Sequence, residues 1–163
     1  MRLGRRERHT FCVDPIDRAI IEQLRRDCRV SNTELADRVG LTPSPCLRRV
    51  RRLEQEGAIL GYHARIEPKV LGRGFEVQVD FELTDQARAT VERFEAELVA
   101  CDEVVEVRRM FGAPDYHALV AVADLETYEQ FMAQRLLALP GLAKLQSRFA
   151  MKTLKSGISP RTG

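Results

Sequence analysis

Two short helices joined by a tight turn can be traced in residues 31–54, and this pair constrains the chain more than any other feature. Ser31 is a good N-cap, and Glu34 completes a Ser-x-x-Glu capping box. Gly40 ends the first helix, because glycine tolerates the left-handed conformation of the C′ position. Thr42 caps the second helix, and the proline after it fits the first helical position. The spacing therefore predicts a helix-turn-helix.

The second helix combines an apolar stripe with an arginine-rich face. At about 100° per residue, one side of it carries Cys46, Val50 and Leu53. Four arginines lie within five positions, Arg48, Arg49, Arg51 and Arg52. Arg48 and Arg51 point away from the stripe with Arg52 beside them, whereas Arg49 lies on the flank, where it could reach a phosphate or an acidic partner. An ordinary solvated basic helix is the alternative, but the capped helix-turn-helix favours double-stranded DNA.

A third helix is expected before this pair. Asp14 is its N-cap, and Ile16, Ile20 and Leu24 follow at helical spacing with Ala19 among them. The three helices predict a winged-helix-like DNA-binding domain over residues 14–60. Serine can bond a base edge or a phosphate, and arginine can bond guanine O6 and N7. The residues expected to contact DNA are Ser31, Thr33, Thr42, Ser44, Arg48, Arg49, Arg51 and Arg52.

Charge is divided unevenly along the chain. Residues 1–66 hold 14 Lys/Arg and 9 Asp/Glu, a net charge of +5, and residues 67–163 hold 12 and 15, a net charge of −3. A basic front and an acidic back fit a nucleic-acid module followed by a regulatory or assembly module. Residues 1–13 are expected to be a flexible basic arm, which could touch DNA phosphates through Arg2, Arg5, Arg6 and Arg8; a membrane-surface arm is the weaker alternative.

Several classes of protein are disfavoured by composition and motifs. A hydrophobic fraction of 44% supports a packed core. No window approaches the roughly 20 apolar residues of a membrane span, and no signal peptide is recognisable, so a cytoplasmic, nucleoid-associated protein is expected. The four cysteines form no C-x-x-C pair, which argues against zinc. Scattered histidines and the absence of a catalytic motif predict no enzyme and no cofactor.

The second half alternates strand and helix patterns. Phe75, Val77, Val79 and Phe81 alternate with polar residues, the sign of a half-buried strand. The expected elements are strands at 75–82, 104–110, 116–123 and 142–154 and helices at 86–100 and 125–138, with Val91, Phe94, Leu98 and Val99 on the inner side of the first. This β-α-β-β-α-β order predicts a ferredoxin-like domain over residues 75–155, making the chain α+β. Residues 61–74 are expected to be a linker strand and connector, the strand running over 58–66, and 156–163 a tail.

The chain resembles the Lrp/AsnC family of leucine-responsive, feast/famine regulators over roughly residues 14–155. The matching residues include Ile16-Asp17-Arg18, Arg29-Val30-Ser31, Glu34-Leu35-Ala36, Val39-Gly40-Leu41-Thr42, Arg52-Leu53-Glu54 and Leu139-Pro140-Gly141-Leu142. The resemblance implies a transcriptional regulator that pairs its C-terminal sheets in a dimer and assembles further, commonly to octamers or hexadecamers. Apolar residues on the strands also suggest that a partner sheet covers the open sheet face.

The loop 111–116 is the candidate small-molecule site. Its N–H groups could bind a carboxylate and Asp115 an ammonium group, which suits a free amino acid, although a plain hairpin turn with a capping Asp is the alternative. In the family this loop contributes to an effector pocket between dimers. The expected effector-binding residues are Met110, Phe111, Gly112, Asp115, Tyr116 and Ser147.

Two departures from the family pattern concern the effector. Ala113 stands where the loop commonly has Asp, and Leu145 and Ser147 stand where the last strand often has threonines. The effector is therefore expected to differ from leucine or to be absent. The last strand is more similar to the branch that controls amino-acid catabolism or efflux. The function expected is control of amino-acid metabolism or transport genes; an architectural DNA-wrapping protein without a ligand is the alternative, and an enzyme on a ferredoxin-like domain is disfavoured.

Overall fold

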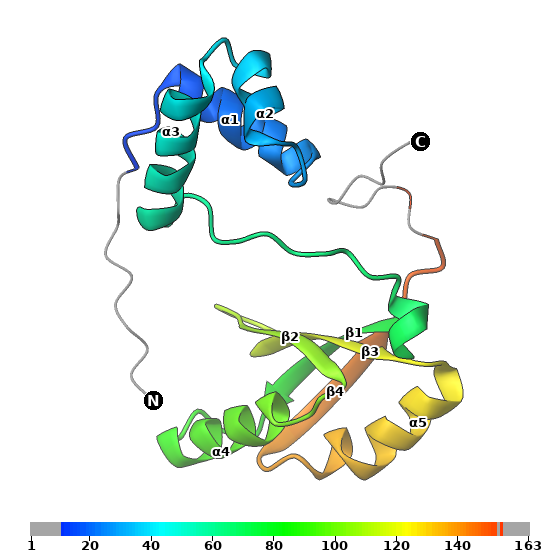
Figure 1. The fold of residues 1–163 in the computed structure, drawn as a ribbon. Helices are drawn as coiled ribbons and strands as arrows, with labels where there is room; N and C mark the ends of the chain where they lie inside the picture. The colour runs from blue at the N-terminus through cyan, green and yellow to red at the C-terminus, as the bar shows by residue number, and fades with distance from the viewer. Residues whose placement is uncertain (1–10, 153, 155–163) are drawn as a thin grey trace. The chain divides into compact units, whose positions relative to one another are not determined.

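The structure is a computed structural model that describes residues 11–152 and 154 (Figure 1). The chain divides into two compact units, with the boundary between Ala64 and Arg65. The arginines of the predicted basic arm, Arg2, Arg5, Arg6 and Arg8, and the whole predicted tail over residues 156–163 lie outside the described residues. Within the described part, no helix combines the length and apolar character needed to cross a membrane.

The N-terminal unit contains the three predicted helices, α1 (Pro15–Arg26), α2 (Asn32–Arg38) and α3 (Pro43–Gln55). Asp14 caps α1 in a reciprocal capping box with Asp17. Ser31 caps α2 by accepting a hydrogen bond from the Glu34 N–H at 3.2 Å. The predicted second half of that box is absent from the described contacts, because the Glu34 carboxylate pairs with Arg38 instead. Thr42 occupies the N-cap position of α3 but makes no side-chain cap hydrogen bond, which corrects its predicted role.

The core of this unit lies where the helical periodicity placed it. Its fully buried members are Ile20, Leu35, Ala36, Cys46 and Leu53. Ile16, Leu24, Val39 and Val50 pack around them as partly buried residues. Ala19, which follows the same spacing on α1, is exposed, and Asp17 is buried in this helix instead. A carboxylate thus occupies an interior position that the apolar pattern could not identify.

The predicted strand over residues 58–66 is wrong. This segment contains no helix or strand, and residues 60–66 are exposed. A strand requires a hydrogen-bonded neighbour, and the described part of the chain pairs none with this segment. The connector after it forms a short 3₁₀ helix, Pro68–Leu71.

The C-terminal unit has the predicted order β1 (Phe75–Leu83), α4 (Arg88–Val99), β2 (Val104–Arg109), β3 (Tyr116–Val122), α5 (Leu125–Gln134) and β4 (Leu142–Arg148), with a 3₁₀ turn, Leu136–Ala138, after α5. The strands form one antiparallel sheet in the order β2-β3-β1-β4. Both helices cover one face of it (Figure 1). This is the predicted ferredoxin-like arrangement. The last strand ends at Arg148, earlier than expected, and the Phe149 ring packs against Phe75 with 5.4 Å between centroids.

The helix-covered face holds the core of this unit. Val77, Val79 and Phe81 of β1 are fully buried, and the Phe94 ring of α4 lies between Phe81 and Tyr116. Val99, expected on the inner side of α4, is 68% exposed, because the helix ends there and leaves it outside the core.

The open face of the sheet carries both charged and apolar side chains. The alternate positions of β1 carry Glu76, Gln78, Asp80 and Glu82. Opposite them on β4 stand Lys144, Gln146 and Arg148. Lys144 Nζ lies 2.8 Å from Glu82, and Asp80 pairs with Arg148 and with His117 Nδ1 of β3. The alternating apolar residues of β1 pack on the helix-covered face, but on β3 the open face carries Leu119 and Ala121, opposite Gln78 and Glu76. The partner sheet on this face therefore stays a prediction.

Candidate functional site

The outward face of α3 presents two arginines that form no ion pair with any other described residue. Arg48 and Arg51 are exposed and form no salt bridge with another described residue. A hollow of about 570 Å³ on this face is lined by Ser44, Leu47, Arg48, Arg51, Arg52 and Gln55. Ser44 lies in the first turn of the helix and is exposed. This surface can donate hydrogen bonds to phosphates or base edges, as the helical periodicity predicted.

The other two arginines of α3 turn toward α1. Arg49 Nη1 donates to Asp14 Oδ2 at 2.6 Å and to Asp17 Oδ1 at 2.8 Å. Arg52 Nη2 donates to the other oxygen of Asp17. These hydrogen bonds raise the pKa of Arg49, and the Asp17 N–H and the Arg49 guanidinium lower the pKa of Asp14. The sequence left either a phosphate or an acidic side chain as the partner of Arg49, and in the structure Arg49 binds the carboxylates of Asp14 and Asp17.

The remaining predicted DNA-contacting residues stand around the turn. Ser31, Thr33 and Thr42 are all exposed at the start of α2 or α3. The Ser31 hydroxyl is engaged in its cap, whereas Asn32, which was not predicted to matter, ties the two helices by donating to the Pro43 carbonyl at 2.8 Å. Asparagine next to an N-cap has no distinctive pattern in the sequence, so only the packed turn reveals its contact.

The loop between β2 and β3 forms a second candidate site. Its cavity of about 520 Å³ is lined by Glu82, Leu83, Gln86, Arg109, Met110, Phe111, Gly112, Ala113 and Asp115. Four of the six predicted effector residues therefore come together: Met110, Phe111, Gly112 and Asp115. Gly112 takes a φ of 101°, and the Phe111 side chain is fully exposed.

Asp115 anchors this loop to the end of β1. Its carboxylate accepts the Leu83 N–H at 2.7 Å and the Gln86 amide at 2.8 Å. Its own N–H and carbonyl bond to Phe81 and Met110. Asp115 therefore has the capping role in a hairpin turn that was expected from the sequence as the alternative to ligand binding. A carboxylate has about four acceptor positions, so the two bonds leave capacity for an ammonium group.

The structure does not bring Tyr116 and Ser147 into the loop cavity. Tyr116 is 1% exposed, and its hydroxyl donates to Glu95 at 2.8 Å. Burial, and after it the hydrogen bond to Glu95, raises the pKa of Tyr116 to about 12. The Ser147 hydroxyl lies on the helix-covered face beside Tyr128 and Met132. Strand alternation places both side chains toward the core, away from the loop.

Charged and polar groups of the loop cavity were missed by sequence reasoning. Arg109 at the end of β2 and Glu82 near the end of β1 supply a cation and an anion. The Arg109 guanidinium donates to Gln86 at 3.3 Å and lies 5.9 Å from the centroid of the Tyr116 ring. A cavity with groups of both signs can bind a molecule that carries both a carboxylate and an ammonium group. Arg109 and Glu82 lie far apart in the sequence, and only the register of the strands brings the end of β2 close to the end of β1.

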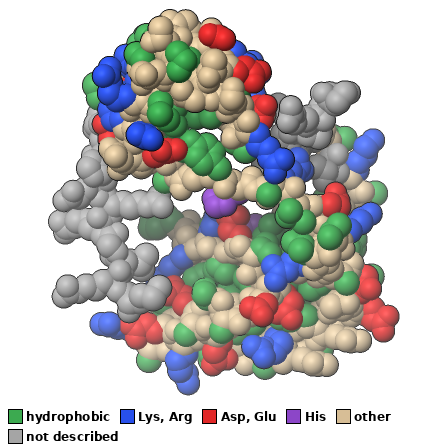
Figure 2. Space-filling model, in the orientation of Figure 1, with side chains coloured by type: hydrophobic (Ala, Val, Ile, Leu, Met, Phe, Trp, Pro, Cys, Tyr) green, Lys and Arg blue, Asp and Glu red, His purple; other side chains and the backbone are tan. Residues whose placement is uncertain are grey.

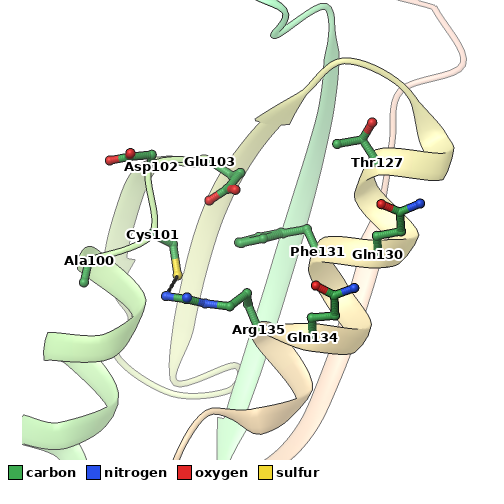
Figure 3. A pocket seen from close by; sticks show the side chains of 9 residues that line it. All are labelled: Ala100, Cys101, Asp102, Glu103, Thr127, Gln130, Phe131, Gln134 and Arg135. Atoms are coloured by element: carbon green, nitrogen blue, oxygen red, sulfur yellow. Dashed lines mark hydrogen bonds between the residues drawn. The ribbon is translucent and has the colours of Figure 1, made fainter.

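A separate cavity of about 420 Å³ lies between the α4–β2 connection and α5 (Figure 3). Arg135 projects from the end of α5 toward Cys101, and its Nη2 lies 3.7 Å from the Cys101 sulfur. Phe131 points into the space between the two elements, whereas none of the predicted effector residues lines it. In residues 11–152 and 154, no group of His, Cys, Asp or Glu is arranged to hold a metal ion.

Comparison with known proteins relates both units to described domains. Residues 13–59 match the family model of a winged helix-turn-helix DNA-binding domain. Residues 76–160 match the model of the Lrp/AsnC ligand binding domain. The chain is 38% identical over 143 residues to the leucine-responsive regulatory protein of Salmonella typhimurium, covering 88% of this chain and 87% of that protein. The protein of the same name from Escherichia coli K12 gives the same identity and coverage.

Solved structures give the same relationship. A transcriptional regulator from Neisseria meningitidis in complex with L-Met is similar with a TM-score of 0.82 and 30% identity, over 90% of this chain and 96% of that one. An AsnC family transcriptional regulator from Agrobacterium tumefaciens has a TM-score of 0.80 and 30% identity, over 88% and 93% of the two chains.

Proposed function

The chain belongs to the Lrp/AsnC family of DNA-binding transcriptional regulators, and from this premise we propose that Arg48 and Arg51 of α3 read its operator sequence. The single observation that carries the assignment is that these two arginines are exposed on the outward face and free of salt bridges with other described residues. Arginine can form a bidentate pair with guanine in the major groove, and such a pair discriminates by about 1–3 kcal/mol. Ser44 on the same face is placed to contact a phosphate or a base edge.

The test is competition between an operator selected from random duplexes and a random-sequence duplex. Arg48→Ala and Arg51→Ala should each reduce the preference for the operator by about 5- to 150-fold, the equivalent of one bidentate pair. Arg88→Ala is the matched control, because this arginine is 90% exposed but belongs to the other unit. Unchanged operator preference in both α3 variants, with circular dichroism unchanged, would refute the assignment.

We further propose that the effector is a free amino acid bound in the loop cavity. The L-Met complex of the Neisseria meningitidis relative supports this class of ligand. Arg109 would bind the carboxylate, and Asp115 with Glu82 the ammonium group. The effector alters DNA binding only if it binds one assembly state better than another, so the coupling should appear in oligomer size and DNA affinity together.

Two variants locate the effector. Asp115→Asn keeps the shape of the side chain and an acceptor for the Leu83 N–H, but removes the charge. It should abolish the amino-acid response while operator binding by the ligand-free chain stays within about twofold. Arg135→Ala, in the other cavity of the same unit, is the control. The twenty amino acids are titrated while sedimentation and DNA anisotropy report oligomer size and DNA affinity. A response lost only in the Arg135 variant would show that the effector binds in that other cavity. No response to any amino acid would favour a ligand-free architectural protein.

The assembly and the cellular setting are part of the same proposal. We propose a homo-oligomer, with a dimer that assembles toward an octamer, acting in the cytoplasm at the nucleoid without catalysis or a cofactor and controlling amino-acid metabolism or transport genes. The family supports this assembly, and the fully exposed Phe111 at the loop tip offers an apolar contact for a second copy. A regulator should prefer its operator over random DNA by about 10³ or more, whereas an architectural protein should show much less preference.

A further inference from the structure

Asp17 is the one charged side chain that is buried among the described residues. It lies in the first turn of α1, and its two oxygens face the two arginines of α3 that do not point outward. Its Oδ2 also accepts the Asp14 N–H at 3.1 Å. Burying an unpaired carboxylate costs several kcal/mol, so the folded unit needs the two arginines beside Asp17, and Asp17 in turn fixes the position of their guanidinium groups.

The arginines held by Asp17 lie close to the proposed DNA-reading face. Arg52 lines the same hollow as Arg48 and Arg51, and its side chain is 42% exposed. Its guanidinium is nevertheless turned inward, with Nη2 on Asp17 and Nε 3.8 Å from Glu56. Arg49, 27% exposed, is held by Asp17 and Asp14 together. Two of the four arginines of α3 thus have their charge balanced within the protein.

We propose that Asp17 is a specificity-determining residue, which withholds Arg49 and Arg52 from DNA phosphates and so restricts binding by α3 to the contacts of Arg48 and Arg51. Phosphate contacts supply most of the affinity for non-specific DNA, and they carry no sequence information. Each arginine kept away from phosphate lowers non-specific binding while leaving base reading intact. The inference rests on the proposed role of α3 in reading DNA.

If Asp17 withholds the two arginines, removing its charge should increase the affinity for non-specific DNA. A purely structural role of Asp17 predicts no such increase. In the full-length chain, Asp17→Asn keeps hydrogen-bond acceptance at this position and removes the charge that the two guanidinium groups share, while Arg49 keeps its contact with Asp14. Affinity for a random-sequence duplex should rise roughly eightfold at 0.1 M salt for each arginine released, and the slope of log affinity against log salt should steepen by about 0.9 for each. The ratio of operator to random affinity should fall accordingly.

A double-mutant cycle identifies Arg52 as one of the released groups. Arg52→Gln, which still donates to Asp17, should change random-duplex affinity less than about twofold in the wild-type background. In the Asp17→Asn background the same change should lower random-duplex affinity by about eightfold, the share of the gain that comes from Arg52. Arg51→Gln is the matched comparison and should weaken operator binding in both backgrounds; if it does not, the proposed reading face fails independently of Asp17.

Two results would overturn the inference. One is an Asp17→Asn chain that remains folded, judged by its thermal transition, and binds operator and random duplex more weakly by the same factor with an unchanged salt slope. The other result applies if Asp17→Asn does not fold, and it uses single arginine variants in the wild-type background. If Arg49→Gln and Arg52→Gln weaken random-duplex binding as much as Arg48→Gln and Arg51→Gln do, all four arginines contact phosphate and the inference fails.

Discussion

The hydroxyl oxygens of Tyr128 and Ser147 lie 2.5 Å apart and join α5 to β4 on the helix-covered face of the sheet. Tyr128 is 4% exposed, so its phenol depends on this contact for a hydrogen-bond partner. Removing one member of a buried hydrogen-bonded pair leaves the other unsatisfied, whereas removing both is less costly. The pair therefore stabilises the packing of the C-terminal unit.

We expect Ser147→Ala to lower the free energy of unfolding by about 1–3 kcal/mol, because the Tyr128 hydroxyl is left without its partner. Tyr128→Phe should cost a similar amount, and the double variant should cost less than the sum of the two. Urea unfolding measures all three. Because the Ser147 hydroxyl lies away from the loop cavity, the amino-acid response of Ser147→Ala should equal that of the unaltered chain; a lost response would return Ser147 to the effector site.

Gly141, in the turn before β4, should tolerate no larger side chain. It has a φ of 72°, and a Cβ built there would lie 2.2 Å from Thr90 Cγ2 of α4. Gly141→Ala should lower the free energy of unfolding by more than the roughly 1–2 kcal/mol typical of a left-handed conformation alone. Gly72→Ala is the control, since its φ is 66° and nothing lies within 4 Å of the added atom. Equal losses of unfolding free energy in the two variants would show that Thr90 moves away from the added methyl group without a measurable cost.

Alkaline pH should destabilise both units. Burial first, and then a hydrogen bond to a glutamate, raises the pKa of Tyr116 and that of Tyr62 to about 12 each, although Tyr116 is 1% exposed and Tyr62, only partly covered, is 45% exposed. The unfolded chain releases these protons near pH 10, whereas the folded chain keeps them, so this contribution to stability is complete below about pH 10 and is lost as the pH rises through about 12.

Tyrosinate absorbance and urea midpoints between pH 9 and 12 test this expectation. The folded chain should show little tyrosinate at pH 10, because burial also raises the pKa of Tyr128, the third tyrosine. Tyr116→Phe should reduce the loss of stability above pH 10. Titration of all three phenols near pH 10 with the chain still folded would contradict the prediction.

Two carboxylates on the open sheet face should differ in importance. The Asp80 side chain is 11% exposed and lies between Arg148 and His117. The Glu82 side chain is 42% exposed, and among the described residues it pairs with Lys144 alone. Asp80→Asn should lower the free energy of unfolding by about 1–3 kcal/mol. Glu82→Gln should cost less than about 0.5 kcal/mol, as is usual for an exposed pair. Chemical unfolding at low and high salt compares them, and equal costs would contradict the difference in burial.

Much of the fold could be predicted because it depends on neighbours in sequence. Ser31 and Asp14 cap the helices that follow them, and the period-two alternation from Phe75 to Phe81 places β1 with one face inward. The β-α-β-β-α-β order then restricts the topology to very few arrangements. The outward direction of Arg48 and Arg51 follows from helical geometry alone, so the candidate DNA-reading face was accessible to the same reasoning.

Contacts between distant residues decided the rest. Arg49 and Arg52 look like their neighbours in sequence, but Asp17, more than thirty positions earlier, draws them inward. Periodicity places Tyr116 and Ser147 on strands, yet only the assembled core shows that their hydroxyls pair with Glu95 and Tyr128. A local pattern specifies the direction of a side chain relative to its own helix or strand, whereas the pairing of a charge or hydroxyl depends on which other element packs against it, and that is determined only in the tertiary structure.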